Sequence, residues 1–290
     1  MPEGGALRVA ADLRRYSAEL EPDVIHAHSS WGGVWARIRP FDSPIVYQPH
    51  CYKFADVTTS LFKRFVFWAA EAALARRAAA IIALTEWERR HSVRLGARRV
   101  VVVPNAPTVR HEPVVPQIGS RGSVVVMVGR ICAQKDPEFF ARVAQTLRAS
   151  HPRTIFRWVG DGDPQMRDEL LSEGIEVSGW LDDDAALARE IAAADVYLHT
   201  ARYEGFPLSV LDAARLGTPV VGRDIAAFEG SGLWTVRDAH EAASALRSCL
   251  DSPSVAAEAL ARTRAVESLM WASPYATTLD ELYANVGGCR

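Results

Sequence analysis

Cysteine is scarce in this chain of 290 residues, and its scarcity argues against a fold held together by disulfides or by a zinc ion. The four cysteines, at positions 51, 132, 249 and 289, are widely separated and form no C-x-x-C pair. Neither a disulfide framework nor a structural zinc site is therefore indicated. This pattern of cysteine use fits a reducing cytoplasm, and the first residues do not form a signal peptide.

The sequence also has little net charge and no uninterrupted apolar run. Its formal net charge is −2, so no global basic field points to nucleic acid as a partner. The most apolar stretch, residues 61–84, is broken by lysine, arginine and glutamate, which argues against a transmembrane helix there. The composition is that of an ordinary globular protein, and its length is sufficient for two domains.

What the sequence does have is a regular alternation of short apolar runs and longer segments with helical spacing. The predicted strands are 24–28, 45–48, 80–84, 100–103, 124–128, 154–159, 175–177, 196–199 and 218–221. The predicted helices include 6–20, 61–79, 137–149, 164–172, 185–193 and 275–286. Such alternation favours an α/β fold with parallel sheets and helices on both faces.

A break in this alternation predicts the domain boundary. Residues 108–122 contain prolines, glycines and serines without periodicity, which is typical of a linker. We therefore expect a first domain over residues 1–107, the linker over 108–122, a second domain over 123–270 and a C-terminal helical segment over 271–290.

The stretch Tyr203–Val221 carries the strongest functional signal. Glu204 opens a tight loop, Pro207 suits the first position of a helix, and Gly217 suits its C-terminal end. The start of such a helix offers unpaired backbone N–H groups and the positive end of a dipole, which attract phosphate. Asp212 lies in an otherwise apolar part of this helix, where a carboxylate is costly without partners.

Two cations follow the first strand of the second predicted domain. Arg130 and Lys135 lie beyond the carboxyl end of strand 124–128, where open α/β sheets bind their ligands. Charge-assisted hydrogen bonds from both would suit a diphosphate, and a solvated loop is the alternative. The motif Gly160-Asp161-Gly162 follows the next strand but lacks the third glycine of a dinucleotide fingerprint. It either lines a binding cleft or is a purely structural turn.

Histidines at strand ends are further candidates. His50 follows strand 45–48 and either faces a binding site or is a satisfied core residue. His26 and His28 share one face of a strand, as a metal pair would, but no third ligand has suitable spacing and buried structural histidines are the alternative.

The predicted helix 61–79 mixes aromatic and basic side chains. That composition occurs in helices that lie on a membrane surface. Packing on the sheet of the first domain is the commoner explanation, and we prefer it. A peripheral position at the inner face of the membrane stays open.

In their order along the chain, these motifs resemble those of the retaining GT-B glycosyltransferases of the group 1 family, which includes sucrose-phosphate synthase. The family pattern of glutamate, seven residues, glutamate and A-x-x-x-G-x-P-V-V is matched from Glu204 to Val221, with Asp212 in place of the second glutamate. The resemblance implies two Rossmann-like domains that face a cleft, with the last helix packed back on the first, acceptor-side domain.

The resemblance also implies an activity and a set of site residues. A sugar would pass from a nucleotide diphosphate sugar, such as a UDP- or GDP-sugar, to a glycan, a lipid-linked or a small-molecule acceptor. The configuration would be retained, without a metal or other cofactor. The catalytic residues so implied are Glu204 and His50, and the donor-binding residues are Arg130, Lys135, Gly205, Phe206, Pro207, Leu208 and Asp212.

For Asp212 the family role is to accept hydrogen bonds from the ribose hydroxyls. An ion pair with Arg215 or Arg223 is the structural alternative. Family members usually begin with a strand and a glycine-rich loop before the helix that matches residues 6–20, so the resemblance implies a first domain that lacks its first strands. A non-catalytic protein that binds nucleotide sugar or assists a partner transferase is therefore the alternative to an enzyme.

Overall fold

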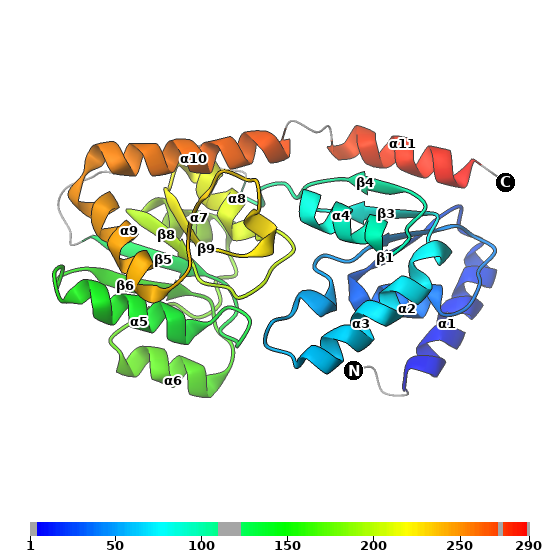
Figure 1. Ribbon diagram of the computed structural model, residues 1–290, viewed down its shortest axis with the longest axis horizontal. Coiled ribbons are helices and arrows are strands. Elements are labelled where there is room, and N and C mark those ends of the chain that lie inside the picture. The colour runs from blue at the N-terminus through cyan, green and yellow to red at the C-terminus, as the bar shows by residue number, and fades with distance from the viewer. Residues whose placement is uncertain (1–4, 110–122, 272–274, 289–290) are drawn as a thin grey trace. The chain divides into compact units, whose positions relative to one another are not determined.

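The computed structural model describes residues 5–109, 123–271 and 275–288, and Figure 1 shows its helices and strands. The chain divides into two compact units. The first unit comprises Met1–Asn105, Glu204–Phe206 and Ser273–Arg290, and the second comprises Ala106–Tyr203 and Pro207–Ala272. Most of the predicted linker, residues 110–122, lies outside the described residues.

The first unit is built on a four-stranded parallel sheet whose strands follow the chain order β1-β2-β3-β4. Within it, Ile25 of β1 lies opposite Ile45 of β2, and His28 lies opposite Gln48. Before the edge strand β1, the described part of the chain forms α1. The elements are α1 (Gly5–Leu20), β1 (Ile25–His28), α2 (Ser29–Arg37), β2 (Ile45–Gln48), η1 (Lys53–Ala55), α3 (Leu61–Leu74), η2 (Ala75–Arg77), β3 (Ala80–Ala83), α4 (Glu86–Arg94), β4 (Val100–Val102) and α11 (Tyr275–Gly287).

Both faces of this sheet are covered, as parallel strands require. Every side chain of β2 and β3 is buried. Tyr47 and Ile81 pack on one face against residues of α2, α3 and α4. On the other face, Val46 and Ile82 pack against α11, which Figure 1 shows on the opposite side of the strands from α2 and α3.

The second unit contains a six-stranded parallel sheet in the order β10-β9-β8-β5-β6-β7. Its core includes the fully buried side chains of Met127, Phe156, Trp158 and Tyr197. The elements are β5 (Val124–Val128), α5 (Pro137–Arg148), β6 (Ile155–Val159), α6 (Pro164–Ser172), β7 (Glu176–Val177), α7 (Asp184–Ala192), β8 (Val196–His199), α8 (Leu208–Leu216), β9 (Val220–Arg223), η3 (Ala226–Phe228), β10 (Trp234–Val236), α9 (Ala239–Asp251) and α10 (Pro253–Trp271). The two sheets confirm the predicted α/β class.

Local signals explain where several helices begin. Asp136 and Asp163 each accept a hydrogen bond from a backbone N–H of the first helical turn, and each precedes a proline at the first helical position. Thr85 caps α4 by accepting a hydrogen bond from the backbone N–H of Glu88. Gly217 ends α8 in the left-handed conformation, with φ +81°, which confirms its predicted role.

The structure corrects three boundaries. The helix predicted over 61–79 ends at Leu74, and a single 3-10 turn then buries Ala75 and Ala78 before the chain enters β3. Pro207 is not the first helical residue but the N-cap of α8, with an extended backbone (φ −73°, ψ 124°) that its ring permits because the ring fixes only φ. The strand predicted from position 218 begins at Val220, because Thr218 closes the end of α8 through its backbone N–H.

Within the described ranges, every helix is too short or too polar to cross a membrane.

Candidate functional site

The loop after β5 lies where the strand order of the second sheet reverses. β6 and β7 follow on one side of β5, whereas β8, β9 and β10 lie on the other. Open α/β sheets bind their ligands beyond the carboxyl ends of the strands at such a point. Arg130 and Lys135, the cations predicted to hold a diphosphate, both lie in this loop, with Arg130 exposed and Lys135 half-buried.

Glycines allow the neighbouring turn to pack tightly against this loop. A Cβ atom at Gly160 would lie 2.3 Å from the carbonyl oxygen of Gly129, and one at Gly162 would lie 2.1 Å from that of Ile131. The backbones bond instead: the N–H of Ile131 donates to the carbonyl of Asp161 over 2.9 Å. The turn Gly160-Asp161-Gly162 therefore supports the cationic loop, and a place in a binding cleft stays a prediction.

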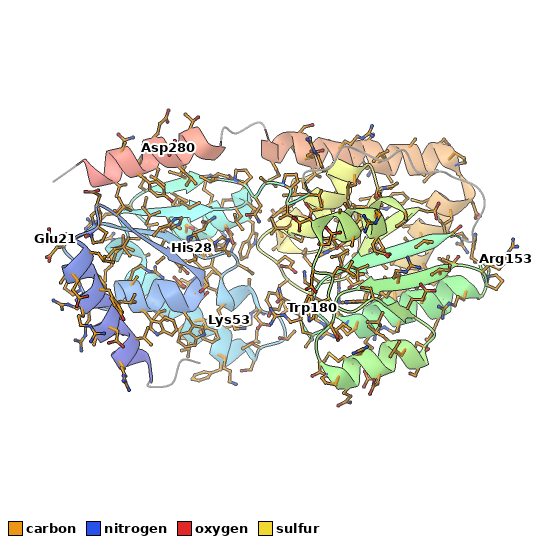
Figure 2. The ribbon with its side chains drawn as sticks, turned by 180° about the vertical axis from the view of Figure 1, so that it is seen from behind. Glu21, His28, Lys53, Arg153, Trp180 and Asp280 are labelled. Carbon is orange, nitrogen blue, oxygen red and sulfur yellow. The ribbon has the colours of Figure 1, made fainter. Side chains whose placement is uncertain are left out.

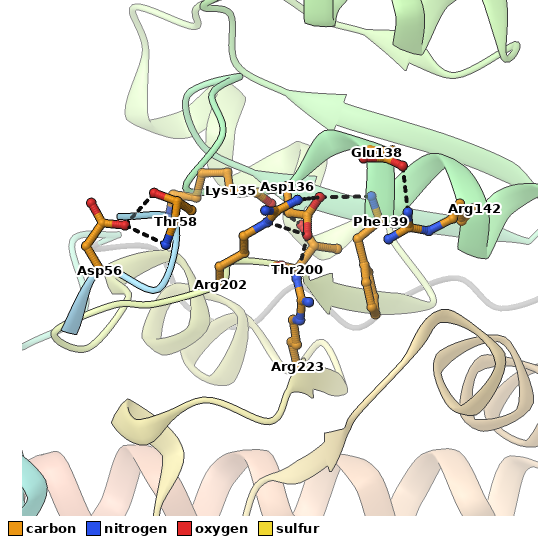
Figure 3. A network of polar contacts seen from close by, with 10 residues as sticks. All are labelled: Asp56, Thr58, Lys135, Asp136, Glu138, Phe139, Arg142, Thr200, Arg202 and Arg223. Atoms are coloured by element: carbon orange, nitrogen blue, oxygen red, sulfur yellow. Dashed lines mark hydrogen bonds and ion pairs between the residues drawn. The ribbon is translucent and has the colours of Figure 1, made fainter. Parts of the chain in front are cut away.

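Asp136, the residue after Lys135, joins three segments of the second unit (Figure 3). Its carboxylate accepts hydrogen bonds from Nε and Nη2 of Arg202, 2.8 and 3.0 Å away, and from Nη1 of Arg223. It also accepts from the backbone N–H of Phe139 over 3.2 Å. Burial alone would raise the pKa of Asp136, but the hydrogen bonds from the two arginines outweigh it and hold that pKa below its ordinary value. Asp136 is thus a carboxylate at neutral pH.

This network leaves the loop with an excess of positive charge. The loop carries Arg130 and Lys135, whereas the carboxylate of Asp136 is shared by Arg202 and Arg223. The neighbouring acids Asp161 and Glu138 pair with Arg167 and Arg142. The hydroxyl of Thr200 donates to the carbonyl oxygen of Lys135 over 2.6 Å and so fixes the backbone that carries the lysine. An anion with several oxygens is the ligand that such a loop can hold.

His199 lies at the end of β8, fully buried beside this loop. Within the described part of the chain, neither of its ring nitrogens has a hydrogen-bond partner. Burial and the positive charge of Lys135 hold the pKa of His199 well below its ordinary value. The ring is therefore neutral and adds no charge to the cationic loop.

In the first unit, His50 and Cys51 follow β2 with consecutive left-handed backbones, φ +53° and +102°. Such conformations are costly for residues other than glycine and persist only where the surroundings impose them. Glu88 supplies that constraint. Its Oε1 accepts from the N–H of Cys51 over 2.8 Å and its Oε2 accepts from the N–H of Leu84 over 2.7 Å. Burial raises the pKa of Glu88 to about 7, although these two donors favour the carboxylate.

The imidazole of His50 is paired with that of His28. Their atoms Nε2 and Nδ1 lie 2.8 Å apart, and Figure 2 labels His28 in the first unit. Burial, and then the proximity of His28, lower the pKa of His50, so its ring is mainly neutral at neutral pH. One of the two nitrogens must donate and the other accept, which links the tautomers of the two rings.

His26 lies outside this pair and bonds to the C-terminal helix. Its Nδ1 lies 2.8 Å from the hydroxyl of Tyr283, and burial together with His28 and His50 lowers its pKa to about 4. In the portion of the chain that the structure describes, no cluster of three histidine, cysteine, aspartate or glutamate side chains is arranged to hold a metal ion.

The loop Glu204–Phe206 belongs to the first unit and packs against His50. A Cβ atom at Gly205 would lie 2.9 Å from the carbonyl carbon of His50 and 3.0 Å from the side chain of Leu84, so only glycine fits there. Asn105 holds the next residue by donating from Nδ2 to the carbonyl oxygen of Phe206 over 2.9 Å. Half-buried Glu204 and the more exposed His50, the two predicted catalytic residues, therefore lie in one compact unit.

The remaining predicted donor-binding residues belong to the second unit. Pro207 is buried, whereas Leu208 is exposed at the start of α8. Asp212 is 2% exposed, and its carboxylate is engaged. Oδ1 accepts from the N–H groups of Thr108 and Val109 over 2.6 and 3.1 Å, and Oδ2 accepts from the Thr108 hydroxyl over 2.7 Å. Burial nevertheless raises the pKa of Asp212.

The alternative of an ion pair between Asp212 and a nearby arginine is wrong. Arg215 pairs with Glu267, and Arg223 pairs with Asp136. Asp212 instead anchors the first two residues of the predicted linker, Thr108 and Val109. Because a carboxylate has about four lone-pair sites, the three observed hydrogen bonds leave room for another donor. Its contact with ribose stays a prediction.

Several residues of this arrangement were not predicted. Asp136 follows Lys135 and precedes a proline, which signals a helix cap but not its two arginine partners. Glu88 belongs to a Thr-Glu-x-Glu segment, whose pattern indicates the start of a helix but not a clamp on the His50 loop.

Comparison with known proteins agrees with this geometry. Residues 2–106 match the domain family described as glycosyl transferase 4-like domain, and residues 122–252 match the one described as glycosyl transferases group 1. The chain has the GT-B glycosyltransferase fold. Sucrose-phosphate synthase from Thermosynechococcus elongatus superimposes with a TM-score of 0.81 at 20% identity, over 97% of this chain and 78% of that chain. HepE from Anabaena, solved in complex with UDP and glucose, gives a TM-score of 0.75 at 19% identity, over 97% of this chain and 84% of that chain.

The chain is also similar to curated proteins. An Escherichia coli protein named UDP-Gal:alpha-D-GlcNAc-diphosphoundecaprenol alpha-1,3-galactosyltransferase is 26% identical over 228 residues, which cover 70% of this chain and 58% of that protein. The GT-B chain described here spans about 60% of the length of the first curated relatives that it matches.

Proposed function

We propose that this GT-B chain belongs to an enzyme that transfers a sugar from a nucleotide diphosphate sugar to an acceptor, with retention of the anomeric configuration. The observation that carries the proposal is the cationic loop after β5 at the switch point of the second sheet, where Arg130 and Lys135 lie next to a buried carboxylate, Asp136, that Arg202 and Arg223 already pair. A diphosphate matches this excess of positive charge, and HepE, which has the same fold, was solved with UDP-glucose.

Each predicted site residue then takes a role. Arg130 and Lys135 hold the diphosphate, and the start of α8 after Pro207 offers backbone N–H groups to it. Glu204 and His50 face the sugar, held by the loop of Gly205 and Phe206. Asp212 accepts from the ribose hydroxyls, and Leu208 contacts the nucleotide.

In the proposed reaction, the bond between the anomeric carbon and the diphosphate oxygen breaks, and the acceptor oxygen bonds to the same face of that carbon. The acceptor proton passes to the departing diphosphate. Arg130 and Lys135 stabilise the negative charge that grows on this leaving group, which lowers the barrier because the charges are in place beforehand. Because Arg130 and Lys135 stabilise the leaving group's negative charge, as a bound metal ion does in other enzymes, we expect turnover without an added divalent ion.

Titration calorimetry with UDP tests the diphosphate site. Lys135→Ala and Arg130→Ala should each weaken binding by about 1.5–3 kcal/mol, the contribution of a hydrogen bond to a charged group. Arg153→Ala is the matched control, because Arg153 is exposed at the amino end of β6, the end of the sheet away from this loop (Figure 2). Unchanged affinity in both loop variants would reject the site.

The stereochemistry and the catalytic step are tested separately. The anomer of the product, read by nuclear magnetic resonance against that of the donor, decides between retention and inversion. Binding of UDP-sugar without turnover on any glycan, lipid-linked or small-molecule acceptor would favour a non-catalytic nucleotide-sugar-binding protein instead. The acceptor named for the Escherichia coli relative makes a lipid-linked acceptor at a membrane surface the first class to try.

A further inference from the structure

The first two turns of α3 expose an apolar surface that the fold of the first unit leaves open. Leu61 is 79% exposed, Phe62 76%, Phe65 61%, Val66 47% and Trp68 41%. We call these five residues the α3 patch. Exposed large apolar side chains are ordinary when scattered, but five within eight consecutive residues form a contiguous surface of the kind that binds something.

The opposite face of α3 is fixed in the core, so the helix cannot rotate to bury the patch. Phe67 packs against the core cluster of the first unit. Glu71 is buried and accepts from Nη2 of Arg37 and from the hydroxyl of Tyr47, each 2.8 Å away. Arg37 is fully buried as well. Breaking such a pair is costly, so the contacts hold α3 with the patch directed outward.

The charged side chains of the patch segment are all basic. Residues 57–70 contain Lys63 and Arg64 and no acidic residue, and the acids at its two ends, Asp56 and Glu71, are buried and paired with Lys53 and Arg37. Lys63 is exposed, and Nε of half-buried Arg64 donates to the carbonyl oxygen of Phe54 over 2.8 Å. The rings of Phe65 and Trp68 stack with centroids 6.2 Å apart. The α3 patch thus combines exposed apolar side chains with nearby cations. This combination complements a surface in which a layer of negative charge covers an apolar layer.

We propose that the α3 patch binds the surface of a membrane that contains anionic lipids. This inference rests on the proposed function, since a lipid-linked acceptor would be met at such a surface. At 14 residues, α3 is about 21 Å long, which is too short to cross the hydrocarbon layer. It lies in the interface instead, with Phe62 and Phe65 among the acyl chains and Lys63 at the headgroups.

Vesicle flotation of the 290-residue chain tests the proposal. The chain should float with vesicles of phosphatidylglycerol and phosphatidylcholine and bind much less to phosphatidylcholine alone. The double variant Phe62→Ser/Phe65→Ser should lower the partition coefficient by about tenfold or more, because the burial of two aromatic side chains is lost. Lys63→Gln should lower the partition coefficient by about fivefold, and only at low salt.

The matched control is Leu171→Ser/Leu269→Ser, which removes two exposed apolar side chains of the second unit and should leave flotation unchanged.

The outcomes separate the possible partners of the patch. If the wild-type chain does not float, or if the control variant loses flotation as much as the patch variant, the proposal is overturned. A concentration-dependent dimer in lipid-free sedimentation that Phe62→Ser/Phe65→Ser abolishes would assign the patch to a second copy of the chain and also overturn it. If Phe62→Ser/Phe65→Ser has a lower melting temperature than the wild type, its loss of flotation does not test the patch. The salt-dependent loss of flotation in Lys63→Gln then decides whether the proposal holds.

The proposed function fails independently of this inference. UDP-sugar affinity, measured by calorimetry without lipid, should be the same in the wild type and in Phe62→Ser/Phe65→Ser. Flotation without UDP-sugar binding would reject the transferase and keep the membrane surface, and the reverse result would reject only the membrane surface.

Discussion

Nδ1 of His28 lies 2.8 Å from Nε2 of His50, and this contact joins the carboxyl ends of two neighbouring strands. His28 ends β1 and lies opposite Gln48 in the sheet, two residues before His50. The proton shared by the two nitrogens decides which nitrogen of His50 is left to donate or accept elsewhere. His28 is therefore a positioning residue for His50 if His50 contacts the donor sugar, as proposed.

The first prediction follows from this bond. His28→Phe should lower kcat about threefold to tenfold, because a neutral hydrogen bond contributes about 0.5–1.5 kcal/mol. The affinity for UDP should not change, since the proposed diphosphate site lies in the second unit. His28→Asn, which places an amide near the position of Nδ1, should recover part of the loss. Steady-state kinetics across pH, with exposed His240→Phe as the control, checks this. A lower melting temperature with an unchanged kcat would mean that the bond serves stability alone.

The second prediction concerns the pH dependence of stability through Glu88. Its pKa is about 7 in the folded protein, above the 4.5 of an unperturbed glutamate. The folded state therefore holds more protons than the unfolded state between these values, and stability from Glu88 falls as pH rises through the window. The fall is on the order of 3 kcal/mol between about pH 4.5 and 7.

Glu88→Gln does not titrate, so the stability of the wild type relative to this variant should decrease by about 3 kcal/mol between about pH 4.5 and 7. Denaturant unfolding of both proteins at several pH values measures the difference. Glu86→Gln changes an exposed glutamate of the same helix and should keep the wild-type slope. If the unfolding free energies of the wild type and Glu88→Gln change equally with pH, the raised pKa of Glu88 is contradicted.

Much of the fold could be predicted because its signals are local. The strands β2, β5 and β8 coincide with the predicted ranges, since buried parallel strands appear as short apolar runs. The cap of α4 at Thr85 also depends on neighbours a few residues apart. Near α3, by contrast, the pattern could not tell which apolar side chains would stay exposed, because the buried partners Arg37 and Tyr47 lie far from it in sequence.

The partners of the site residues were not predictable for the same reason. Asp136 bonds to arginines 66 and 87 residues away, and Glu88 bonds to Cys51 across 37 residues. Periodicity and spacing carry no information on such pairs. The sequence motifs marked Arg130 and Lys135 but not the buried carboxylate that orders the loop around them.

The third prediction uses that carboxylate. Asp136→Ala should lower the free energy of unfolding by about 2–4 kcal/mol, because it removes the cap of α5 and leaves Arg202 and Arg223 without their common partner. Glu138→Ala, two residues on, removes only the exposed pair with Arg142 and should cost about 0–1 kcal/mol (Figure 3). Denaturant unfolding of the two variants gives both numbers. Equal losses would mean that the buried network contributes no more than a surface ion pair.

The last prediction separates two roles of Asp212. Its carboxylate accepts three hydrogen bonds from Thr108 and Val109, yet the proposed function also gives it the ribose hydroxyls. Thr108→Val removes one of those bonds and should lower stability by about 1 kcal/mol while UDP binds as before. Asp212→Ala removes the carboxylate itself, so it should lower stability further and also weaken UDP binding by about 1–3 kcal/mol.

Glu204→Ala should leave UDP affinity intact and reduce turnover, because Glu204 is assigned to the sugar. If Asp212→Ala and Thr108→Val both lower the melting temperature but neither changes the calorimetric affinity for UDP, Asp212 serves only to anchor the Thr108 segment. The ribose must then be held by other groups.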